Sequence, residues 1–340
     1  MKRWRIGLPG LLLSLLATWA LVTQLDLDSL LLSLRSAQYG WLLPAFLLLL
    51  TGQMVRALRW RALLEGGLPL ARSFHILNIS YMANAFLPFR FGELARLWLV
   101  RPGLSSMRTA GSILLERLLD TLAVLVLLAA ALSVLPETGD DYRQAARLML
   151  PLLLVLALAL FSLARQRALA RRLLDWTLRL PWPGVVRRLP LGSWLEALLD
   201  GLQPLTNPAL LLRVLVWTLA GWTLSLLASY LMMLMFYEQA DLAVAALSIV
   251  AAALVIALPA VPGNIGTYQW AIMLALAAGG YGEPLDAPNV SLGLAIHAIN
   301  LLMYTLTGSL GLIQEQVTPV GLIRSLQQFR WRQEGHGNRK

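Results

Sequence analysis

Residues 84–96 read Asn-Ala-Phe-Leu-Pro-Phe-Arg-Phe-Gly-Glu-Leu-Ala-Arg and interrupt a strongly apolar part of the chain. Each ionisable side chain at the centre of a membrane helix costs about 2.5–3.5 kcal/mol. Pro88 removes a backbone donor and Gly92 permits a tight backbone path, so an uninterrupted helix is not expected here. Broken backbone at membrane depth is tolerated only where protein or a water-filled cavity covers it. We therefore predict that this segment is a polar re-entrant site and that the rest of the chain houses it.

The composition of the 340-residue chain is that of a polytopic membrane protein, with 58% hydrophobic residues, 14% charged residues and a mean hydropathy of +0.67. No basic run is interleaved with stacking aromatic residues, so the net charge of +10 indicates cytoplasmic loops rather than nucleic-acid binding. The absence of cysteine and the wide spacing of the three histidines argue against disulfide and metal sites. No nucleophile with a base and no nucleotide-binding loop is found, so we expect no catalytic residue and no cofactor.

Basic clusters alternate with acidic loops along the chain, which predicts a bacterial inner (cytoplasmic) membrane protein with both termini in the cytoplasm. We expect one transmembrane domain over residues 1–320, with a basic cytoplasmic loop at 165–205 and a basic tail at 321–340. Two further segments, 68–101 and 243–281, enter and leave on the same side as helical hairpins. The predicted full spans cover about 8–25, 41–64, 109–135, 147–164, 209–236 and 290–313.

The order span, span, hairpin, span occurs twice, over about 1–140 and again over about 141–320 in the opposite orientation. The hairpin tips at 88–92 and 262–266 both read Pro-x-x-apolar-Gly. Inverted repeats whose broken helices meet near the midplane are typical of transporters with alternating access. Half-helix ends at such a crossing carry free backbone amides and a partial positive charge, which suits a phosphate group.

Charged residues near the first tip allow two interpretations. One is an internal ion-pair network, for instance Arg96 with Asp120 and Arg117 with Glu93, which stabilises the hairpin against the following span. The other is that at least one arginine, Arg90 first, faces an anionic ligand. The charged set and its polar neighbour are Asn84, Arg90, Glu93, Arg96, Glu116, Arg117 and Asp120.

The second tip and the last span carry neutral polar groups that also allow two interpretations. Asn264, Thr267, Tyr268 and Gln269 either satisfy freed backbone groups at the break or contact a headgroup. His297, Asn300 and Tyr304 form a stripe that favours a hydrogen-bonded helix seam, with a proton-linked role for His297 as the alternative.

Arg56 and Arg59 near the end of the second span are either a positive-inside anchor that extends to lipid headgroups or a cytoplasmic vestibule for an anionic headgroup.

Four pieces spread over the whole chain make it similar to the lysylphosphatidylglycerol synthase transmembrane family, in its stand-alone bacterial form. They are the Arg-Ala-Leu-Arg-Trp run at 56–60, residues 84–96 with the Pro-x-Arg-x-Gly-Glu core, Glu-Arg-Leu-Leu-Asp at 116–120, and Pro-Ala-Val-Pro-Gly-Asn-Ile-Gly at 259–266. The resemblance implies a flippase-like domain that moves a phospholipid, such as an aminoacylated phosphatidylglycerol, or another lipid carrier between leaflets.

The resemblance also carries an expected site onto this chain, at the six charged residues Arg90, Glu93, Arg96, Glu116, Arg117 and Asp120 and at the second break. The chain departs from the family at Thr267, where an acid is often found, and at His297 and Asn300, where an arginine is common. The soluble aminoacyl-transferase domain of the two-part synthases is absent, so we expect that this chain does not make the lipid.

Together these features predict an all-α polytopic membrane protein with about six full transmembrane helices and two re-entrant helical hairpins in an inverted-topology repeat. The expected function is translocation of an anionic or zwitterionic lipid without ATP hydrolysis. The expected partners are a phospholipid or polyprenyl-type lipid and the bilayer, with no nucleic acid, and homo-oligomerisation is left open. The expected substrate-binding residues are Asn84, Arg90, Glu93, Arg96, Glu116, Arg117, Asp120, Pro262, Gly263, Asn264, Gly266, His297 and Asn300.

Two other functions fit the same residues. One is a membrane-embedded transferase that modifies a lipid, with Glu93 or Asp120 as its base. The other is a structural partner that docks a lipid synthase.

Overall fold

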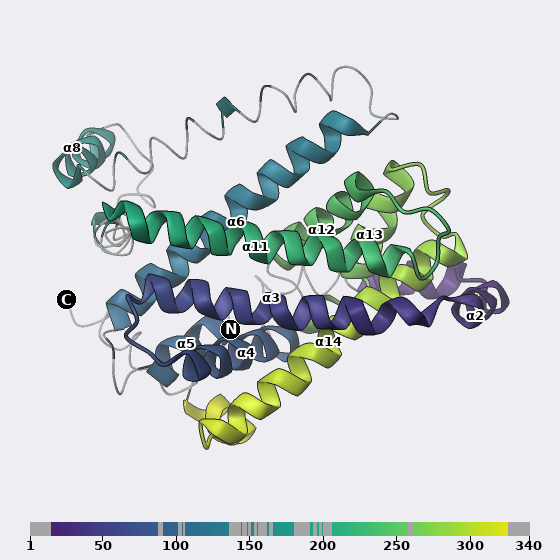
Figure 1. The fold of residues 1–340 in the computed structure, drawn as a ribbon, viewed down its shortest axis with the longest axis horizontal. Helices are drawn as coiled ribbons and strands as arrows, with labels where there is room; N and C mark the ends of the chain where they lie inside the picture. The colour runs from purple at the N-terminus through teal and green to yellow at the C-terminus, as the bar shows by residue number, and fades with distance from the viewer. Residues whose placement is uncertain are drawn as a thin grey trace.

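The computed structural model describes residues 15–87, 91–100, 104, 106–135, 166–179, 206–257 and 262–325, with isolated positions between 144 and 199. These residues form helices joined by turns, and no strand occurs among them. The protein is therefore an all-α membrane protein (Figure 1). The helices and 3-10 turns are α2 (Leu27–Ser36), η1 (Tyr39–Trp41), α3 (Leu42–Leu63), α4 (Leu70–Phe86), α5 (Phe91–Val100), α6 (Ser106–Val134), α8 (Arg167–Leu178), α11 (Pro208–Met233), α12 (Leu242–Ala257), η4 (Pro262–Asn264), α13 (Thr267–Ala278) and α14 (Ala287–Gln314).

Four described helices are long and apolar enough to cross a membrane: α3 with its preceding turn, α6, α11 and α14. They coincide with the spans expected at 41–64, 109–135, 209–236 and 290–313. A fifth span is added if the helix Leu15–Gln24 is counted with α2, to which it is bent by 88°. The expected span at 147–164 lies outside the described residues apart from isolated positions, so the total of six spans stays a prediction.

The first hairpin consists of α4 and α5, which run antiparallel. Near the tip, Gly92 N donates to Asn84 Oδ1 at 2.8 Å, and at the other end Arg72 Nη2 donates to the Leu99 carbonyl at 3.2 Å. Helix α4 ends because Leu87, which precedes Pro88, adopts extended backbone with φ −106° and ψ 144°. The ten residues of α5 measure about 15 Å, half of the roughly 30 Å hydrocarbon thickness, so this arm is too short to cross.

The second hairpin consists of α12 and α13, with η4 at its tip. Its arms are also antiparallel, since a Cβ built on Gly279 at the end of α13 would meet Val244 at the start of α12. The break is sharp because Gly263 and Gly266 have φ of 76° and 82°, a left-handed backbone that favours glycine. Both predicted hairpins are thus present as antiparallel helical arms.

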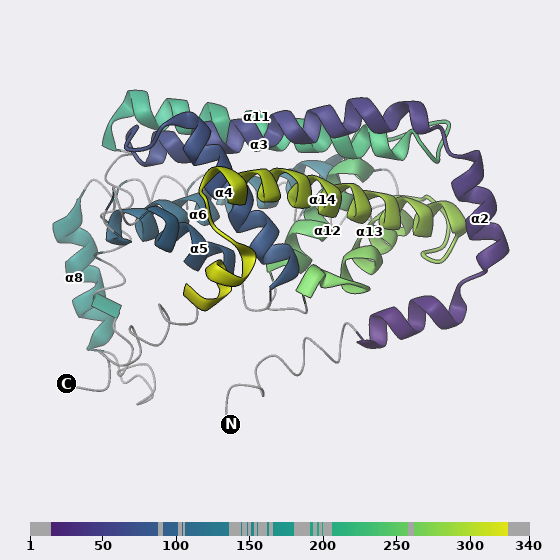
Figure 2. The same cartoon turned by 90° about the horizontal axis from the view of Figure 1, so that it is seen from below.

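The long helices pack in pairs, and the inverted repeat stays a prediction that would make α3 equivalent to α11. Helices α3 and α11 run antiparallel, because the backbone N of Gln38 bonds to Met235 and Arg56 bonds to Ser225, while Leu63 packs against Val214. The last span of each half packs against the first arm of the other hairpin, α14 on α4 and α6 on α12. Figure 2 shows α3 and α11 along one side and the hairpin helices with α14 beneath them.

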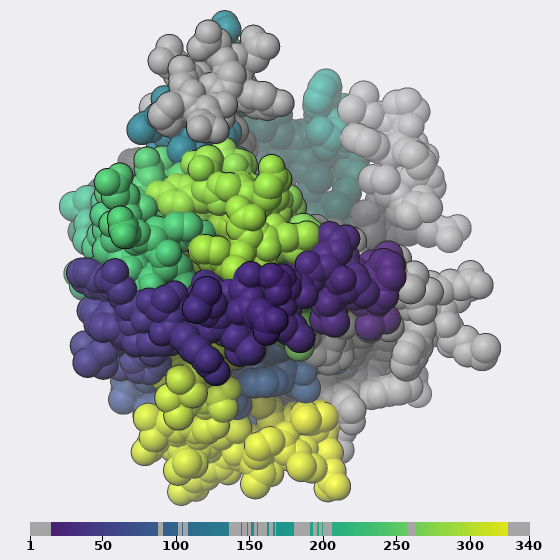
Figure 3. Space-filling view, turned by 90° about the vertical axis from the view of Figure 1, so that its right-hand side faces the viewer, coloured from purple at the N-terminus to yellow at the C-terminus, as the bar shows by residue number. Residues whose placement is uncertain are grey.

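The N-terminal segment covers the second hairpin at the end of the molecule that carries α2. Leu21 and Leu30 are buried against Met273 and Val290, and Trp270 Nε1 donates to the Ala17 carbonyl at 2.8 Å. In the space-filling view this purple segment lies across the end of the molecule beside the green residues (Figure 3). This cover shields the short helix α13, which could not span a membrane by itself.

Candidate functional site

The tips of the two hairpins meet. Turn η4 contacts the end of α4, and a Cβ built on Gly263 would lie 3.5 Å from the carbonyl oxygen of Ala85. Helix α4 ends here and η4 forms the break of the second hairpin, so protein or a water-filled cavity must cover the freed backbone groups of both.

A cavity of about 420 Å³ opens at this crossing, between both hairpins and four of the long helices. It brings together seven of the predicted substrate residues and one of the two predicted vestibule arginines. These are Asn84, Arg117, Asp120, Gly263, Asn264, His297 and Asn300, with Arg56. Other predicted residues lie behind the cavity wall or outside the described part of the chain.

Behind one wall lies a buried ion-pair network centred on Arg59, which is 2% exposed. Its Nη1 donates to Asp120 Oδ1 at 2.7 Å, and its Nη2 donates to Asp120 Oδ2 at 3.0 Å and to Glu116 Oε1 at 3.1 Å. A guanidinium held by two carboxylates cannot serve as a vestibule for ligands. The vestibule interpretation of Arg59 is therefore wrong.

Arg96 belongs to the same network rather than to the cavity surface. It is 1% exposed, its Nη2 donates to Glu116 Oε2 at 2.6 Å, and its guanidinium carbon lies 4.2 Å from the centre of the Trp60 ring. The expected pairing of Arg96 with Asp120 is wrong, because Glu116 takes Arg96 and Arg59 takes Asp120. The physical reason is that Arg59 comes from a different helix, α3, which the spacing around the hairpin does not reveal.

The expected pair of Arg117 with Glu93 is present, and it joins α6 to the first residues of α5. Glu93 also accepts from Asn84 Nδ2 at 3.3 Å, and Asn84 in turn accepts from Gly92 N. This chain of bonds holds the hairpin closed at its tip. Oε2 of Glu93 is buried and has no partner among the described residues, so one acceptor remains unsatisfied.

Arg56 is the guanidinium on the cavity wall that lacks an acid. It lines the cavity and donates to Ser225 Oγ at 2.8 Å, and no described carboxylate pairs with it. One turn earlier on α3, Gln53 lines the same cavity while only 2% exposed, and its Oε1 has no partner among the described residues. An unpaired cation and an unpaired buried acceptor on one wall both call for a polar ligand or water, because such groups are costly when left alone.

The opposite wall is neutral and belongs to the second repeat. Gln269 Nε2 lies 2.6 Å from His297 Nδ1, while Gln269 Oε1 accepts from Gly266 N at 2.8 Å. His297 also bonds to the backbone of Gly263, and Asn300 Nδ2 donates to the Ile296 carbonyl. The bond to Gly266 shows that Gln269 satisfies a backbone group at the break, one of the two roles expected of the polar residues at this tip.

The remaining predicted residues divide into two groups. Gly266 is buried and caps α13, so it lies beside the cavity rather than on it. Arg90 lies outside the described residues, as does the side chain of Pro262, which begins η4.

The sequence reasoning missed Gln53, Tyr81 and Trp222, all of which line the cavity. Gln53 had a readable signal, because it is a polar residue inside an apolar span and shares a face with Arg56 three residues later. Trp222 had none, since it reaches Asp120 from the other repeat, with Nε1 3.2 Å from Oδ1.

A comparison with protein families supports a single assignment. The model described as lysylphosphatidylglycerol synthase TM region matches residues 8–308, most of the chain. No curated protein and no solved structure matches.

Proposed function

The chain belongs to the lysylphosphatidylglycerol synthase TM region family, and on that premise we propose that it is a lipid translocase of the bacterial inner membrane. Its substrate in this proposal is an anionic or zwitterionic phospholipid or lipid carrier, such as an aminoacylated phosphatidylglycerol. It moves the lipid between leaflets without covalent chemistry.

The observation that carries the proposal is the cavity at the meeting of the two hairpin tips, with the guanidinium of Arg56 on its wall and no described acid beside it. At about 420 Å³ the cavity has the size of a headgroup, and ligand sites in proteins run upward from about 300 Å³. Arginine recognises phosphate through strong charge-assisted hydrogen bonds. We therefore assign the phosphate to Arg56, in place of the buried Arg96.

A cationic substituent on the lipid would find acceptors in the same cavity. Asp120 lines it with a side chain 24% exposed, and Oε2 of the nearby Glu93 lacks a partner among the described residues. Both carboxylates already hold an arginine, so a cationic substituent would bind through an oxygen that the arginine leaves free, such as Glu93 Oε2. This arrangement suits a zwitterionic headgroup.

The acyl chains would leave the cavity between α6 and α12. Leu254 and Ile256 line it while 49% and 42% exposed, and Thr121 on α6 is exposed beside them. An apolar rim on a polar cavity suits a lipid whose headgroup is inside and whose tails remain in the bilayer. In this proposal the hairpins rock between two positions, as in other transporters built from inverted repeats.

The orientation in the proposal follows the distribution of charge. Basic clusters fall on one side of the predicted spans, which supports the proposal that both termini lie in the cytoplasm. Accessibility of the termini to a protease added outside spheroplasts tests this part separately.

The deciding experiment is leaflet exchange of labelled phospholipids in proteoliposomes. Arg56→Gln should slow exchange about tenfold, the loss of roughly 1.4 kcal/mol from a charge-assisted contact. Arg35→Gln removes the same charge from an exposed position on α2 and should leave exchange unchanged. Exchange that is absent from the wild type across several headgroups, or equal in both variants, would overturn the proposal.

The transferase is tested in the same preparation by mass spectrometry of the lipids after addition of an activated donor. Asp120 and Glu93 each hold an arginine, so either carboxylate would have to give up that ion pair before it could act as a base. A modified lipid that disappears in Asp120→Asn would favour the enzyme over the translocase.

A further inference from the structure

A second cavity of about 540 Å³ lies between the last turns of α3 and the first turns of α11. On α3 its lining residues are Leu58, Arg61 and Ala62, spaced i, i+3 and i+4 along one face, and Glu65 follows in the turn just after the helix ends. On α11 they include Leu210, Arg213 and Trp217, again on one face. No residue lines both this cavity and the central one.

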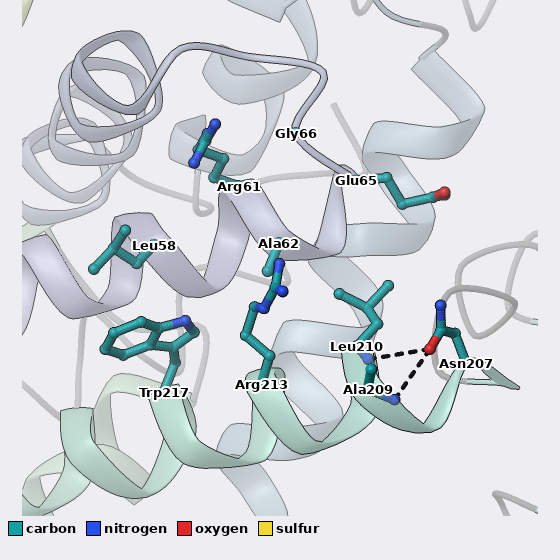
Figure 4. Close-up of a pocket in the computed structure, with 10 residues that line it drawn as sticks. All are labelled: Leu58, Arg61, Ala62, Glu65, Gly66, Asn207, Ala209, Leu210, Arg213 and Trp217. Carbon is teal, nitrogen blue, oxygen red and sulfur yellow. Dashed lines mark hydrogen bonds between the residues drawn. The ribbon is translucent and has the colours of Figure 1, made fainter.

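Arg213 supplies the unbalanced charge of this cavity. Figure 4 shows its side chain reaching from α11 toward Ala62 on α3. It is exposed and has no hydrogen-bond or ion-pair partner in the described part of the chain. The acid of the cavity, Glu65, is engaged by Arg108 at 2.6 Å, and so does not neutralise Arg213.

Other polar groups at the same end are donors. Asn207 Oδ1 accepts from the backbone N of Ala209 and Leu210, at 3.0 and 3.4 Å, so its amide nitrogen is left to face the cavity. Arg61 also lines this cavity; its Nε donates to the Leu68 carbonyl at 3.2 Å, and Figure 4 shows its guanidinium turned away from Arg213. Net positive charge with surplus donors suits an anion such as a phosphate diester.

The polarity of the cavity changes with depth. Asn207 and Glu65 lie at the helix ends, Arg213 lies about 9 Å further along α11, and Trp217 and Leu58 lie deeper still. Polar groups at the ends of two spans and apolar groups about one and a half to two and a half turns inside match the change from headgroups to acyl chains across one leaflet. A free anion has no acyl chains and would contact only the polar part of the cavity near the helix ends.

We propose that this cavity binds an anionic phospholipid of the leaflet at this end of the molecule, as a resident lipid distinct from the transported one. The phosphate is held by Arg213 and the amide of Asn207, and an acyl chain lies against Trp217 and Leu58. The lipid joins α3 to α11, the two equivalent helices of the repeat. This site does not depend on whether the central cavity transports lipid.

The test is native mass spectrometry of the detergent-purified chain titrated with phosphatidylglycerol, phosphatidylcholine or inorganic phosphate. Each titration is made with the wild type and with Arg56→Gln. A binding step that Arg56→Gln weakens belongs to the central cavity and is thereby separated from the step at the second cavity. In both backgrounds Arg213→Gln should weaken one phosphatidylglycerol-binding step about fivefold, the effect of one arginine near an anionic lipid. Arg35→Gln, with the same loss of charge at the other end, should not.

A second variant separates a loss of lipid binding from a loss of folded structure. Asn207→Asp keeps the side-chain acceptor that caps α11 but places a negative charge in the cavity, so it should weaken phosphatidylglycerol binding while the helix stays capped. Phosphatidylglycerol binding unchanged by both variants, or equal binding of phosphatidylcholine, would overturn the proposal. Displacement of the lipid by millimolar inorganic phosphate would also overturn it, in favour of a soluble anion.

Discussion

Arg56 and Arg59 lie three residues apart on α3 and have different surroundings. Arg59 is enclosed by Asp120, Glu116 and Thr218, whereas Arg56 faces the central cavity with Ser225 as its described hydrogen-bond partner. A buried cation with two carboxylates is needed by the fold, because removing it leaves two acids facing one another in a poorly solvated interior. A cation without an acid is available to a ligand.

This difference predicts opposite effects of one substitution at the two positions. Arg59→Gln should lower the free energy of unfolding by about 3–5 kcal/mol, the cost of breaking a buried ion pair from one side. Arg56→Gln should cost less than about 1.5 kcal/mol, since it loses one hydrogen bond to a hydroxyl. Thermal unfolding in the same detergent compares the two, and equal losses would contradict the assignment of Arg59 to the structural network.

Gln53 offers a test in which stability and activity move in opposite directions. Its buried Oε1 lacks a partner in the described chain, and an unsatisfied buried acceptor costs about 1–3 kcal/mol. Gln53→Leu should therefore keep or raise the thermal stability while lipid exchange in proteoliposomes falls. A variant that is destabilised and still fully active would show that Gln53 serves the fold.

At the scale of the elements, the first hairpin depends on close backbone approach at its tip. A Cβ built on Gly92 would lie 2.1 Å from the carbonyl oxygen of Ser80 and 2.6 Å from Asn84 Oδ1. These are atoms of α4, the facing arm, and a backbone carbonyl cannot move without disturbing its helix. The glycine is thus required by the separation of the two arms.

Gly92→Ala should force α5 away from α4 and break the bond from Gly92 N to Asn84. The expected loss is about 1–3 kcal/mol, the usual cost of overpacking. It can be measured by thermal unfolding, with hydrogen exchange of the α5 amides to locate the change. Gly40→Ala is the matched control, because a Cβ there has nothing within 4 Å. Equal behaviour of the two variants would contradict the close approach.

For the whole molecule, the decisive relation is the antiparallel pairing of α3 with α11. A Cβ built on Gly52 would lie 3.9 Å from Leu224 Cβ, within the usual Cβ separation of about 3.5–4.5 Å for a disulfide. The natural chain has no cysteine, so introduced thiols have no competitors.

Gly52→Cys with Leu224→Cys should form a disulfide on mild oxidation, detected by mass after cleavage between the two helices. Gly52→Cys with Val216→Cys should not, since eight residues shift the partner by about 12 Å along α11. If the two helices were parallel or paired in a different register, the difference in disulfide yield between the two cysteine pairs would be reversed or lost.

The sequence by itself determined the class of the protein, four of its described long spans and both hairpins. These features depend on local properties: the length of apolar runs, the extended backbone that Pro88 imposes on Leu87, and the left-handed backbone at Gly263 and Gly266. It also determined that charges near the first tip must be paired or liganded. An isolated charge in a membrane is costly, and this holds before any partner is identified.

Only the tertiary structure decided which charge has which partner. Asp120 is bonded to Arg59 from α3 and Trp222 from α11, at sequence separations of 61 and 102 residues. No spacing rule reaches so far, because such contacts depend on how whole helices cross. The same crossing left Arg56 facing the cavity and buried Arg96 against Trp60, while Arg90, the first expected contact, lies outside the described residues. The proposed phosphate contact is therefore Arg56 and not Arg96.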